Sequence, residues 1–259
     1  MKIVVVGGTG LIGARVVARL SDAGHDVVAA SPSTGVDSFA GIGLRAALAG
    51  AEVLVDVSDW TTAGADSVDF FETSTRHLLT AEVAAGVGHH VVLSVVGIGR
   101  GSDAGYSAGK LAQEQMIIGS PRPYSIVRAT QFFEFIPTII ESLATDRPVA
   151  GLAVPPVRFR PVAADDVADV VARIAEERPL DGVVDVAGPT EYELPAFLAK
   201  ALAVRGDSRV VTVDAEASYF GRKVGRESLV PLLESNFQVG STSYDTFSTK
   251  TANGGRSRG

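Results

Sequence analysis

The sequence predicts an α/β fold, a Rossmann-type doubly wound parallel sheet with a small C-terminal substrate-binding part. Three observations carry this prediction. Short apolar runs rich in Val and Ile alternate with stretches of helical spacing, and a glycine cluster directly follows the first run. After about residue 130 this regular alternation gives way to a less regular pattern. Unbroken apolar runs are typical of parallel strands because both faces of such a sheet are covered. Alternating strands and helices indicate βαβ units with right-handed crossovers.

The apolar runs give the expected strands in order. They cover residues 2–7, 25–31, 51–58, 90–97, 124–130, 182–188 and 208–214. Helices are expected between them. Ile12, Val16 and Leu20 recur at four-residue steps before Gly24, a second helix runs from Phe71 to Val83 and stops near Gly86, and a third covers 111–118.

The chain divides into a core of residues 1–130, a C-terminal part of residues 131–240 that interleaves with the sheet, and a tail of residues 241–259. The C-terminal part contains helical patterns at 132–144 and 193–204, and a third whose cap is expected at Asp165. We expect it to lie over the carboxyl ends of the strands, where open α/β sheets bind ligands. The tail is polar and non-periodic, which predicts disorder.

Composition narrows the class of protein. The chain has 259 residues, no cysteine and a net charge of −7 without long runs of one sign. These features exclude disulfides and thiolate metal sites and argue against nucleic acid. No apolar run approaches the roughly 20 residues that span a bilayer, and MKIVVVGG is too short and glycine-rich for a signal peptide. We therefore expect a cytoplasmic protein that binds neither nucleic acid nor membrane, with a homodimer as one option.

Two pairs of adjacent residues have side chains of the kind that bind metals or act in catalysis. His89 and His90 stand at a strand start, but nothing in the sequence indicates the additional ligands of a metal site. Asp165 and Asp166 are interpreted as helix-capping residues rather than a catalytic carboxylate pair. No metal site is predicted.

The glycine cluster lies between the first strand and an amphipathic helix. It fits Gly8-x-Gly10-x-x-Gly13 and also Gly7-x-x-Gly10-x-x-Gly13. Glycines permit the tight turn and close approach of the backbone to a pyrophosphate, which the helix N-terminus attracts. The cluster therefore predicts a dinucleotide site. The residues expected to contact it are Gly7, Thr9, Gly10, Leu11 and Ile12.

The end of the second strand bears on which dinucleotide binds. An acidic residue there would hold the ribose hydroxyls of NAD. The chain instead has Ser31, Ser33 and Thr34, with Asp37 coming late. Hydroxyls can bond a 2′-phosphate and the missing carboxylate removes a repulsion, which favours NADP(H) over NAD(H). No arginine lies on this loop, although Arg15 or Arg45 could supply charge, and an ordinary polar turn is the alternative.

A second constellation follows at residues 94–110, SVVGIGRGSDAGYSAGK. Tyr106 and Lys110 are four apart and share a helix face, and Ser94 closes a strand upstream. With the glycine turn, this resembles the short-chain dehydrogenase/reductase superfamily over about residues 1–240. The Gly-Gly-Thr-Gly-x-x-Gly form and the segments 127–135 and 162–171 are similar to its extended and atypical branches, the NmrA-like group in particular.

The resemblance implies roles for these residues. Tyr106 would be the general acid–base, Lys110 would tune it and hold the nicotinamide ribose, and Ser94 would bind the substrate oxygen. A free phenol has a pKa near ~10, and an ammonium within ~4–6 Å would lower that value. Further cofactor contacts are implied at Asp56, Val57, Ser58, Ala129 and Thr130, and substrate contacts at Trp60, Gln131, Phe132 and Phe133. For at least two of Phe132, Phe133 and Phe135, core packing is the favoured interpretation.

The predicted activity is NAD(P)H-dependent reduction of a carbonyl, quinone or enone in a small apolar molecule. Two alternatives stay open. One is an NmrA-like sensor that binds NADP without turnover and acts through a protein partner. The other is an isomerase, epimerase or lyase that retains NAD(P). The chain departs from the superfamily where many members have a proton-relay asparagine, because its nearest match is His77, which is interpreted as a histidine on a helix face.

Overall fold

The computed structural model describes residues 1–60, 66–100, 104–145 and 151–256. Its centre is a seven-stranded sheet in which all paired strands run parallel, in the order β11-β8-β5-β4-β3-β1-β2. The strands are β1 Lys2–Val6, β2 Asp26–Ala30, β3 Val53–Asp56, β4 His89–Val95, β5 Tyr124–Ala129, β8 Gly182–Ala187 and β11 Phe237–Val239. The predicted Rossmann-type α/β fold is confirmed.

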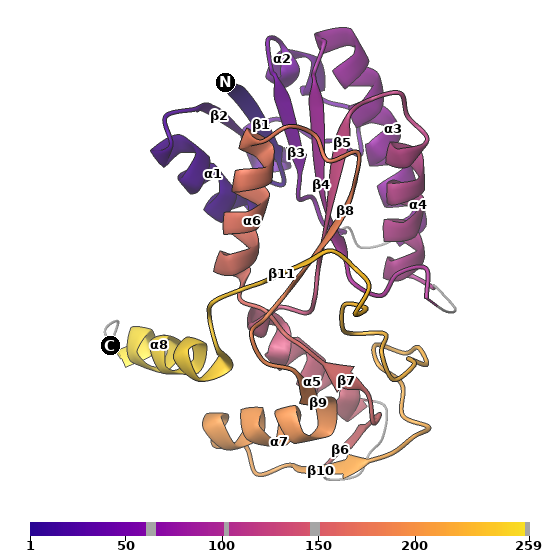
Figure 1. Ribbon diagram of the computed structural model, residues 1–259, viewed down its shortest axis with the longest axis vertical. Coiled ribbons are helices and arrows are strands. Elements are labelled where there is room, and N and C mark those ends of the chain that lie inside the picture. The colour runs from indigo at the N-terminus through magenta and orange to yellow at the C-terminus, as the bar shows by residue number, and fades with distance from the viewer. Residues whose placement is uncertain (61–65, 101–103, 146–150, 257–259) are drawn as a thin grey trace.

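Helices cover both faces of this sheet (Figure 1). The helices α1 Gly13–Asp22 and α6 Ala164–Glu176 pack side by side on one face, where Val16 and Val171 join one apolar cluster with the strands. The other face carries α2 Leu44–Leu48, α3 Ser67–Ala85 and α4 Tyr106–Ile118. Burial on both faces explains why the central strands are mostly apolar.

The chain reverses direction across the sheet at β1. β2 lies on one side of β1 and β3 on the other, and β2 is the edge strand of the sheet. The helices between β2 and β3 are the short 3₁₀ helix η1 Pro32–Thr34 and α2. Such a reversal opens a crevice at the carboxyl ends of the neighbouring strands, which is where open α/β sheets bind ligands. The glycine turn follows β1 at this point.

The smaller part lies beyond the carboxyl ends of the strands, at the bottom of Figure 1. It has its own apolar core, to which α5 Ile136–Thr145 and α7 Leu194–Arg205 contribute. The 3₁₀ helix η2 Phe133–Phe135 leads into α5. Two small sheets complete it: β6 Gly151–Val154 pairs with β10 Val210–Val213, and β7 Arg158–Phe159 pairs with β9 Tyr192–Glu193.

Three local expectations were wrong. The run at 208–214 forms β10, but this strand is largely exposed and pairs with β6 outside the main sheet; β11 takes the edge position instead. The tail is not disordered throughout, because α8 covers Tyr244–Arg256 and packs through Tyr244 on Phe133 and Phe197.

The third concerns α6. Its N-cap residue is Ala163, not Asp165, and the backbone N–H of Ala164 donates to the carboxylate of Glu134, at 3.2 and 3.3 Å. A side chain from the 3₁₀ helix η2 therefore caps this helix. Asp165 instead pairs with arginines of α1, and Asp166 binds the chain before α8.

Candidate active site

The glycine turn is built on close backbone approach. Gly7 has φ +79°, and a Cβ there would lie 2.7 Å from the carbonyl oxygen of Val57, while one on Gly13 would lie 2.0 Å from the carbonyl oxygen of Gly7. Side chains at these positions would push the turn away from the segment after β3. The turn and residues 57–58 are thus held directly against each other.

Gly10 is a different case. A Cβ there would meet only the Gly7 carbonyl oxygen, at 3.3 Å, so internal packing puts a weaker demand on this position. The N-cap of α1 is Ile12, whose side chain makes no capping hydrogen bond with the first N–H groups of the helix. A narrow turn with uncapped helix N–H groups fits the pyrophosphate of a dinucleotide.

The serine turn after β2 is internally bonded. The hydroxyl of Thr34 accepts a hydrogen bond from the Ser31 N–H at 2.9 Å and also contacts the Ala29 carbonyl oxygen, and the Ser31 and Ser33 hydroxyls lie 2.8 Å apart. Ser31 is buried, whereas Ser33 and Thr34 are exposed. The Thr34 hydroxyl is bonded to backbone groups of the turn, so Ser33 carries the exposed hydroxyl with the fewest contacts of the three expected to meet a 2′-phosphate.

The two arginines considered for that phosphate differ in their contacts. Arg15 donates to the Leu11 carbonyl oxygen at 2.6 Å and to Asp165 at 3.1 Å, so its guanidinium is committed to the junction between α1 and α6. Arg45 lies on the short helix α2, on the opposite face of the sheet.

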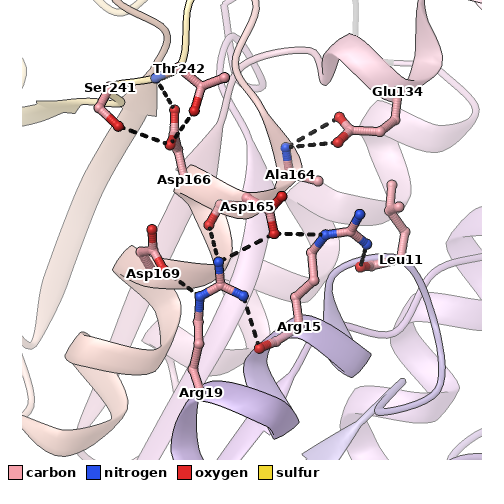
Figure 2. Close-up of polar contacts among 10 residues, drawn as sticks. All are labelled: Leu11, Arg15, Arg19, Glu134, Ala164, Asp165, Asp166, Asp169, Ser241 and Thr242. Atoms are coloured by element: carbon pink, nitrogen blue, oxygen red, sulfur yellow. Dashed lines mark hydrogen bonds and ion pairs between the residues drawn. The ribbon is translucent and has the colours of Figure 1, made fainter. Parts of the chain in front are cut away.

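A cluster of charges ties the glycine-turn helix to α6 (Figure 2). Arg19 of α1 pairs with Asp165 and Asp169 of α6, and Arg15 bonds Asp165 and the turn residue Leu11. These side chains are a quarter to two thirds exposed, so each pair stabilises the fold by only about 0–1 kcal/mol. Their main effect is to fix the direction of α1 relative to α6.

Hydroxyls gather at the carboxyl ends of three adjacent strands. Ser58 follows β3, Ser94 is near the end of β4, and Thr130 follows β5. Each hydroxyl oxygen is buried without a hydrogen-bond partner in the structure. Buried hydroxyls normally find a partner, so three in neighbouring positions indicate a place for polar groups of a ligand or for water.

The start of α4 carries Tyr106 and Lys110 on one face, as the spacing predicts. The ring of Phe71 on α3 contacts both: its centroid lies 5.6 Å from that of Tyr106 and 4.3 Å from the Lys110 ammonium nitrogen. Gly109 allows this packing, because a Cβ there would lie 2.6 Å from Phe71. Phe71 thus orients both side chains. The helical pattern of the sequence places Phe71 in a helix but does not predict these contacts.

Lys110 is buried and bonded to protein groups. Its Nζ donates to the Leu93 carbonyl oxygen at 3.0 Å, to Gln113 Oε1 at 2.9 Å and to the Ser58 carbonyl oxygen at 3.5 Å. Gln113 in turn donates to the buried carboxylate of Asp56 at 2.9 Å. Burial lowers the pKa of Lys110, against the opposing effect of the carboxylates of Asp56, Asp59 and Glu114.

Asp56 therefore faces the helix rather than an open crevice. Its other oxygen accepts the N–H of Ser58 at 2.9 Å, and the residue is almost fully buried. In this arrangement it holds the Lys110–Gln113 pair and the segment after β3. A direct contact of Asp56 with a ribose stays a prediction.

Tyr106 has a raised pKa. Burial of the hydroxyl and then the carboxylate of Asp59 raise the pKa of Tyr106 well above its ordinary value, although the residue as a whole is 38% exposed. The sequence-based expectation was a pKa lowered by Lys110. The structure instead directs the Lys110 ammonium to main-chain and amide oxygens, so Tyr106 is kept in its protonated form.

The residues expected to touch substrate occupy different environments. Trp60 is 38% exposed next to Asp59. Phe133 is buried in the core of the smaller part against Tyr244 and Phe247, so it contributes to packing. Gln131 and Phe132 are partly buried in the connection between β5 and η2, with Phe132 against the sheet core. Ala129 and Thr130 are buried at the end of β5.

Comparison with known proteins agrees with this architecture. Residues 3–90 match the model of the NAD dependent epimerase/dehydratase family. This match covers the first strands of the sheet and the glycine turn, and it supports an NAD(P)-binding fold of the epimerase/dehydratase kind. No curated protein gives a significant match.

Several solved structures share the fold at low sequence identity. MoeE5 in complex with UDP-glucose and NAD is 17% identical, with a TM-score of 0.71 and 100% of both chains covered. DesIV, a dTDP-glucose 4,6-dehydratase from Streptomyces venezuelae with NAD and TYD bound, is 17% identical, with a TM-score of 0.69, 100% of this chain and 98% of that chain covered.

A third structure of the same fold is a reductase. The dTDP-4-dehydrorhamnose reductase from Bacillus anthracis str. Ames in complex with NADP is 15% identical, with a TM-score of 0.65, 91% of this chain and 94% of that chain covered. These relatives include a dehydratase and a reductase, so the shared fold is an NAD(P)-binding one that serves more than one reaction.

None of the helices in the described part of the chain is long and apolar enough to cross a membrane. The sequence carried no sign of the supporting roles of Phe71 and Gln113, because each acts across a tertiary contact rather than through a spacing along the chain.

Proposed function

We propose that this protein is an NADPH-dependent oxidoreductase that reduces a carbonyl, quinone or enone of a small apolar molecule. The observation that carries the proposal is the juxtaposition, at one end of the sheet, of the glycine turn, the segment after β3 and the Tyr106–Lys110 face of α4. Ser94 lies next to Leu93, whose carbonyl oxygen accepts a hydrogen bond from the Lys110 ammonium group. A nicotinamide cofactor supplies hydride chemistry when bound.

The cofactor would be held by Gly7, Thr9, Gly10, Leu11 and Ile12 at its pyrophosphate and by Ser33 at a 2′-phosphate. Gly10 supports this assignment, since internal packing alone makes only a mild demand for glycine there. The absence of a carboxylate at the end of β2, where Ala30 and Ser31 stand, favours NADP(H). Lys110, Thr130 and the segment 56–58 would lie along the nicotinamide ribose.

Tyr106 would supply the proton to the substrate oxygen. Its phenol is protonated at neutral pH and can donate when negative charge develops on the substrate, although the raised pKa makes it a weaker acid than a free phenol in the protein without ligands. The unpaired Ser94 hydroxyl would donate a hydrogen bond to the same oxygen. Phe132 and Trp60 would give the pocket apolar walls.

Two measurements test the proposal. Titration with NADPH and NADH should show tighter binding of NADPH, and stronger NADH binding would contradict the cofactor preference. A panel of carbonyls, quinones and enones, followed by nicotinamide absorbance, should reveal turnover that Tyr106→Phe lowers by about 10² or more while nucleotide affinity is kept. Turnover unchanged in Tyr106→Phe would refute the assigned acid.

One observation favours a second candidate. The match of residues 3–90 to the NAD dependent epimerase/dehydratase family supports an isomerase, epimerase or lyase that keeps its NAD(P). Purified protein carrying tightly bound nucleotide, with product formed and no net cofactor consumption, would support this candidate over the reductase. A sensor of the NmrA type is the remaining alternative, and it would bind NADP but turn over nothing in either Tyr106 form.

A further inference from the structure

We infer that residues 225–230 hold the loop after Ser94 in place, and that Arg100 on this loop is a positioning residue for the proposed active site. The inference rests on the proposed function, because it acts through Ser94 and Tyr106. It adds two segments to which the sequence assigned no role. Neither touches substrate or cofactor in this proposal, so both act on the geometry of the site rather than on the reacting atoms.

Residues 225–230, which we call the brace, belong to the smaller part. The chain between β10 and β11 leaves that part and returns to the main sheet (Figure 1). The Arg158 N–H at the start of β7 donates to the Arg226 carbonyl oxygen at 2.8 Å. Leu229 forms a β-bridge with Phe159 and is buried in the core of the smaller part. The brace is therefore fixed to the smaller part.

The brace meets the loop after β4 at Gly97. A Cβ on Gly97 would lie 1.8 Å from the Ser228 carbonyl oxygen, so the two backbones are in direct contact. Two hydrogen bonds close the turn that carries this carbonyl group: the Gly225 N–H donates to Ser228 Oγ at 3.0 Å, and the Ser228 N–H donates to the Gly225 carbonyl oxygen at 3.1 Å. Gly97 also has a φ of +96°, which a residue with a side chain rarely adopts. The close approach and this backbone conformation both require glycine.

Arg100 makes a second contact with the brace. Its side chain is 19% exposed, and its Nη1 donates to the Val230 carbonyl oxygen at 2.8 Å and to the Glu227 carbonyl oxygen at 3.5 Å. Val230 is buried, and a buried carbonyl oxygen requires a donor. On its other side the Arg100 guanidinium lies 3.8 Å from the buried carboxylate of Asp185 on β8. Arg100 thus joins the loop to the brace and to the main sheet.

The braced loop starts at the proposed site. The Ser94 hydroxyl, which would bind the substrate oxygen, is buried without a hydrogen-bond partner among the described residues. Two residues later the Val96 N–H donates to the Ala129 carbonyl oxygen at 2.9 Å, at the end of β5. The same stretch of chain leads on to Tyr106 at the start of α4. A displaced loop would therefore change the position of Ser94 relative to Tyr106, and misplacement by about 1 Å can cost about 10²-fold in rate.

The first test compares two glycines of this loop. Gly97 and Gly99 both have positive φ, +96° and +75°, so an alanine at either position strains the backbone. Only at Gly97 would the new methyl group strike the brace, because a Cβ on Gly99 would meet Leu111 at an ordinary contact distance of 3.8 Å. Gly97→Ala should lower kcat about tenfold or more on any substrate that the panel reveals, and Gly99→Ala should lower it much less. Equal losses in the two variants would overturn the inference, because the backbone of the loop would then decide the rate without the brace.

The second test removes the arginine. Arg100→Met keeps most of the length of the side chain but none of its donors, so kcat should again fall about tenfold or more. Nucleotide affinity should be kept, because the glycine turn lies outside these contacts. Arg100→Lys, whose ammonium group can donate to the Val230 carbonyl oxygen, should recover a large part of the rate. Arg178→Met, at an exposed position after α6, is the matched control and should behave as wild type. Wild-type kcat in folded Arg100→Met, or a loss of nucleotide affinity as large as the loss of kcat, would overturn the inference.

A third readout needs no turnover. Amide hydrogen exchange reports local opening of the chain. Residues 225–230 and 94–98 should exchange faster in Gly97→Ala and in Arg100→Met than in wild type, while the glycine turn should exchange as in wild type. In Gly99→Ala and Arg178→Met the exchange of residues 225–230 should not change. Unchanged exchange of the brace in Gly97→Ala and Arg100→Met would show that these contacts do not hold the loop.

The two proposals fail differently. If Tyr106→Phe abolishes turnover but Gly97→Ala and Arg100→Met keep the wild-type kcat, the brace has no role in the rate and the reductase assignment stands. If Tyr106→Phe leaves turnover intact, the assigned proton donor is wrong, and the exchange measurement alone decides whether the brace holds the loop.

Discussion

His89 and His90 stand side by side at the start of β4, yet their imidazoles meet opposite surroundings. His90 forms an ion pair with Glu82 of α3 at 2.6 Å, with both side chains 1% exposed. His89 contacts the hydroxyl of Ser125 at 2.8 Å, and that hydroxyl also accepts the N–H of Leu180. The Ser125 hydrogen is then available to His89, which suits a neutral ring.

The pKa of His90 predicts how the free energy of unfolding changes above pH 6.5. Burial alone would lower this pKa, but the carboxylates of Glu82 and, more distantly, Asp56 outweigh it, so the net pKa is raised above 6.5. The pair's contribution to stability is therefore complete below pH 6.5 and lost as pH rises through the raised value. We expect the free energy of unfolding in urea to decline over this range, by at most about 1.4 kcal/mol per pH unit.

Glu82→Gln and His90→Gln should each remove this decline. If either variant is too unstable to study, the other suffices. A wild-type stability that is flat or rising above pH 6.5, with no difference from the variants, would contradict the ion pair.

The pKa of His89 gives the opposite prediction. Burial and the charge of His90 lower the pKa of His89 to about 4, with partial opposition from Asp181. The unfolded chain then binds more protons between about pH 4 and 6.5, so stability is complete above 6.5 and falls as the solution is acidified. His89→Gln should remove this acid limb and leave the alkaline limb of His90 in place, as measured by urea unfolding across pH. A variant that loses both limbs would show that the two rings titrate as one unit.

At the scale of elements, the active-site face depends on the contact between α3 and α4. A Cβ on Gly109 would lie 2.6 Å from Phe71 and 2.7 Å from the Ser67 carbonyl oxygen. Since Phe71 touches both Tyr106 and Lys110, the spacing of these two helices sets the position of the proposed catalytic pair.

Gly109→Ala should therefore destabilise the protein although alanine is the better helix former. The intrinsic gain is about 1 kcal/mol and the overpacking penalty about 1–3 kcal/mol. We expect a lower thermal midpoint, and a Tyr106 ultraviolet titration that differs from wild type. Gln115→Ala, on the exposed side of the same helix, should leave both unchanged. A higher thermal midpoint for Gly109→Ala would mean that α3 and α4 can move apart without loss of stability.

The elements that sequence predicted correctly are those buried on both sides. β1, β3, β4 and β5 each contain a run of consecutive apolar residues because helices cover both faces of the sheet. The Val-rich run of β10 gives the same signal from an exposed strand, so composition alone misplaced it. β11 has only three residues, Phe237–Val239, too few to show a pattern.

Only those parts of the proposed site that are formed by residues close together in sequence could be predicted. The Gly7–Gly13 turn and the four-residue step from Tyr106 to Lys110 are local patterns. The contacts of Phe71 and Gln113 join segments far apart in sequence. The pKa of Tyr106 is raised by burial and by the Asp59 carboxylate, and both effects depend on the tertiary fold.

At the scale of the whole molecule, the chain after the sheet returns to hold the two parts together. Asp166 at the start of α6 accepts hydrogen bonds from the Thr242 N–H and hydroxyl, both at 2.9 Å, and from Ser241 at 3.4 Å (Figure 2). Two residues further on, Tyr244 enters the core of the smaller part, with ring centroids 5.4 Å from Phe133 and 4.8 Å from Phe197. Phe247 adds a contact 5.2 Å from Phe133.

Ending the chain at residue 240 should therefore unfold more than a tail. Loss of a buried aromatic ring from a core costs about 3–5 kcal/mol, so we expect at least about 3 kcal/mol of destabilisation in urea, with more of the surface of the smaller part open to proteolysis. Ending the chain at residue 251 keeps Tyr244, Phe247 and the Asp166 contacts, and should cost little. Nucleotide affinity should change much less than stability in both, because the glycine turn belongs to the separate core formed by α1, α6 and the sheet. Equal unfolding midpoints for the two truncations would show that the aromatic contacts of α8 contribute nothing to the fold.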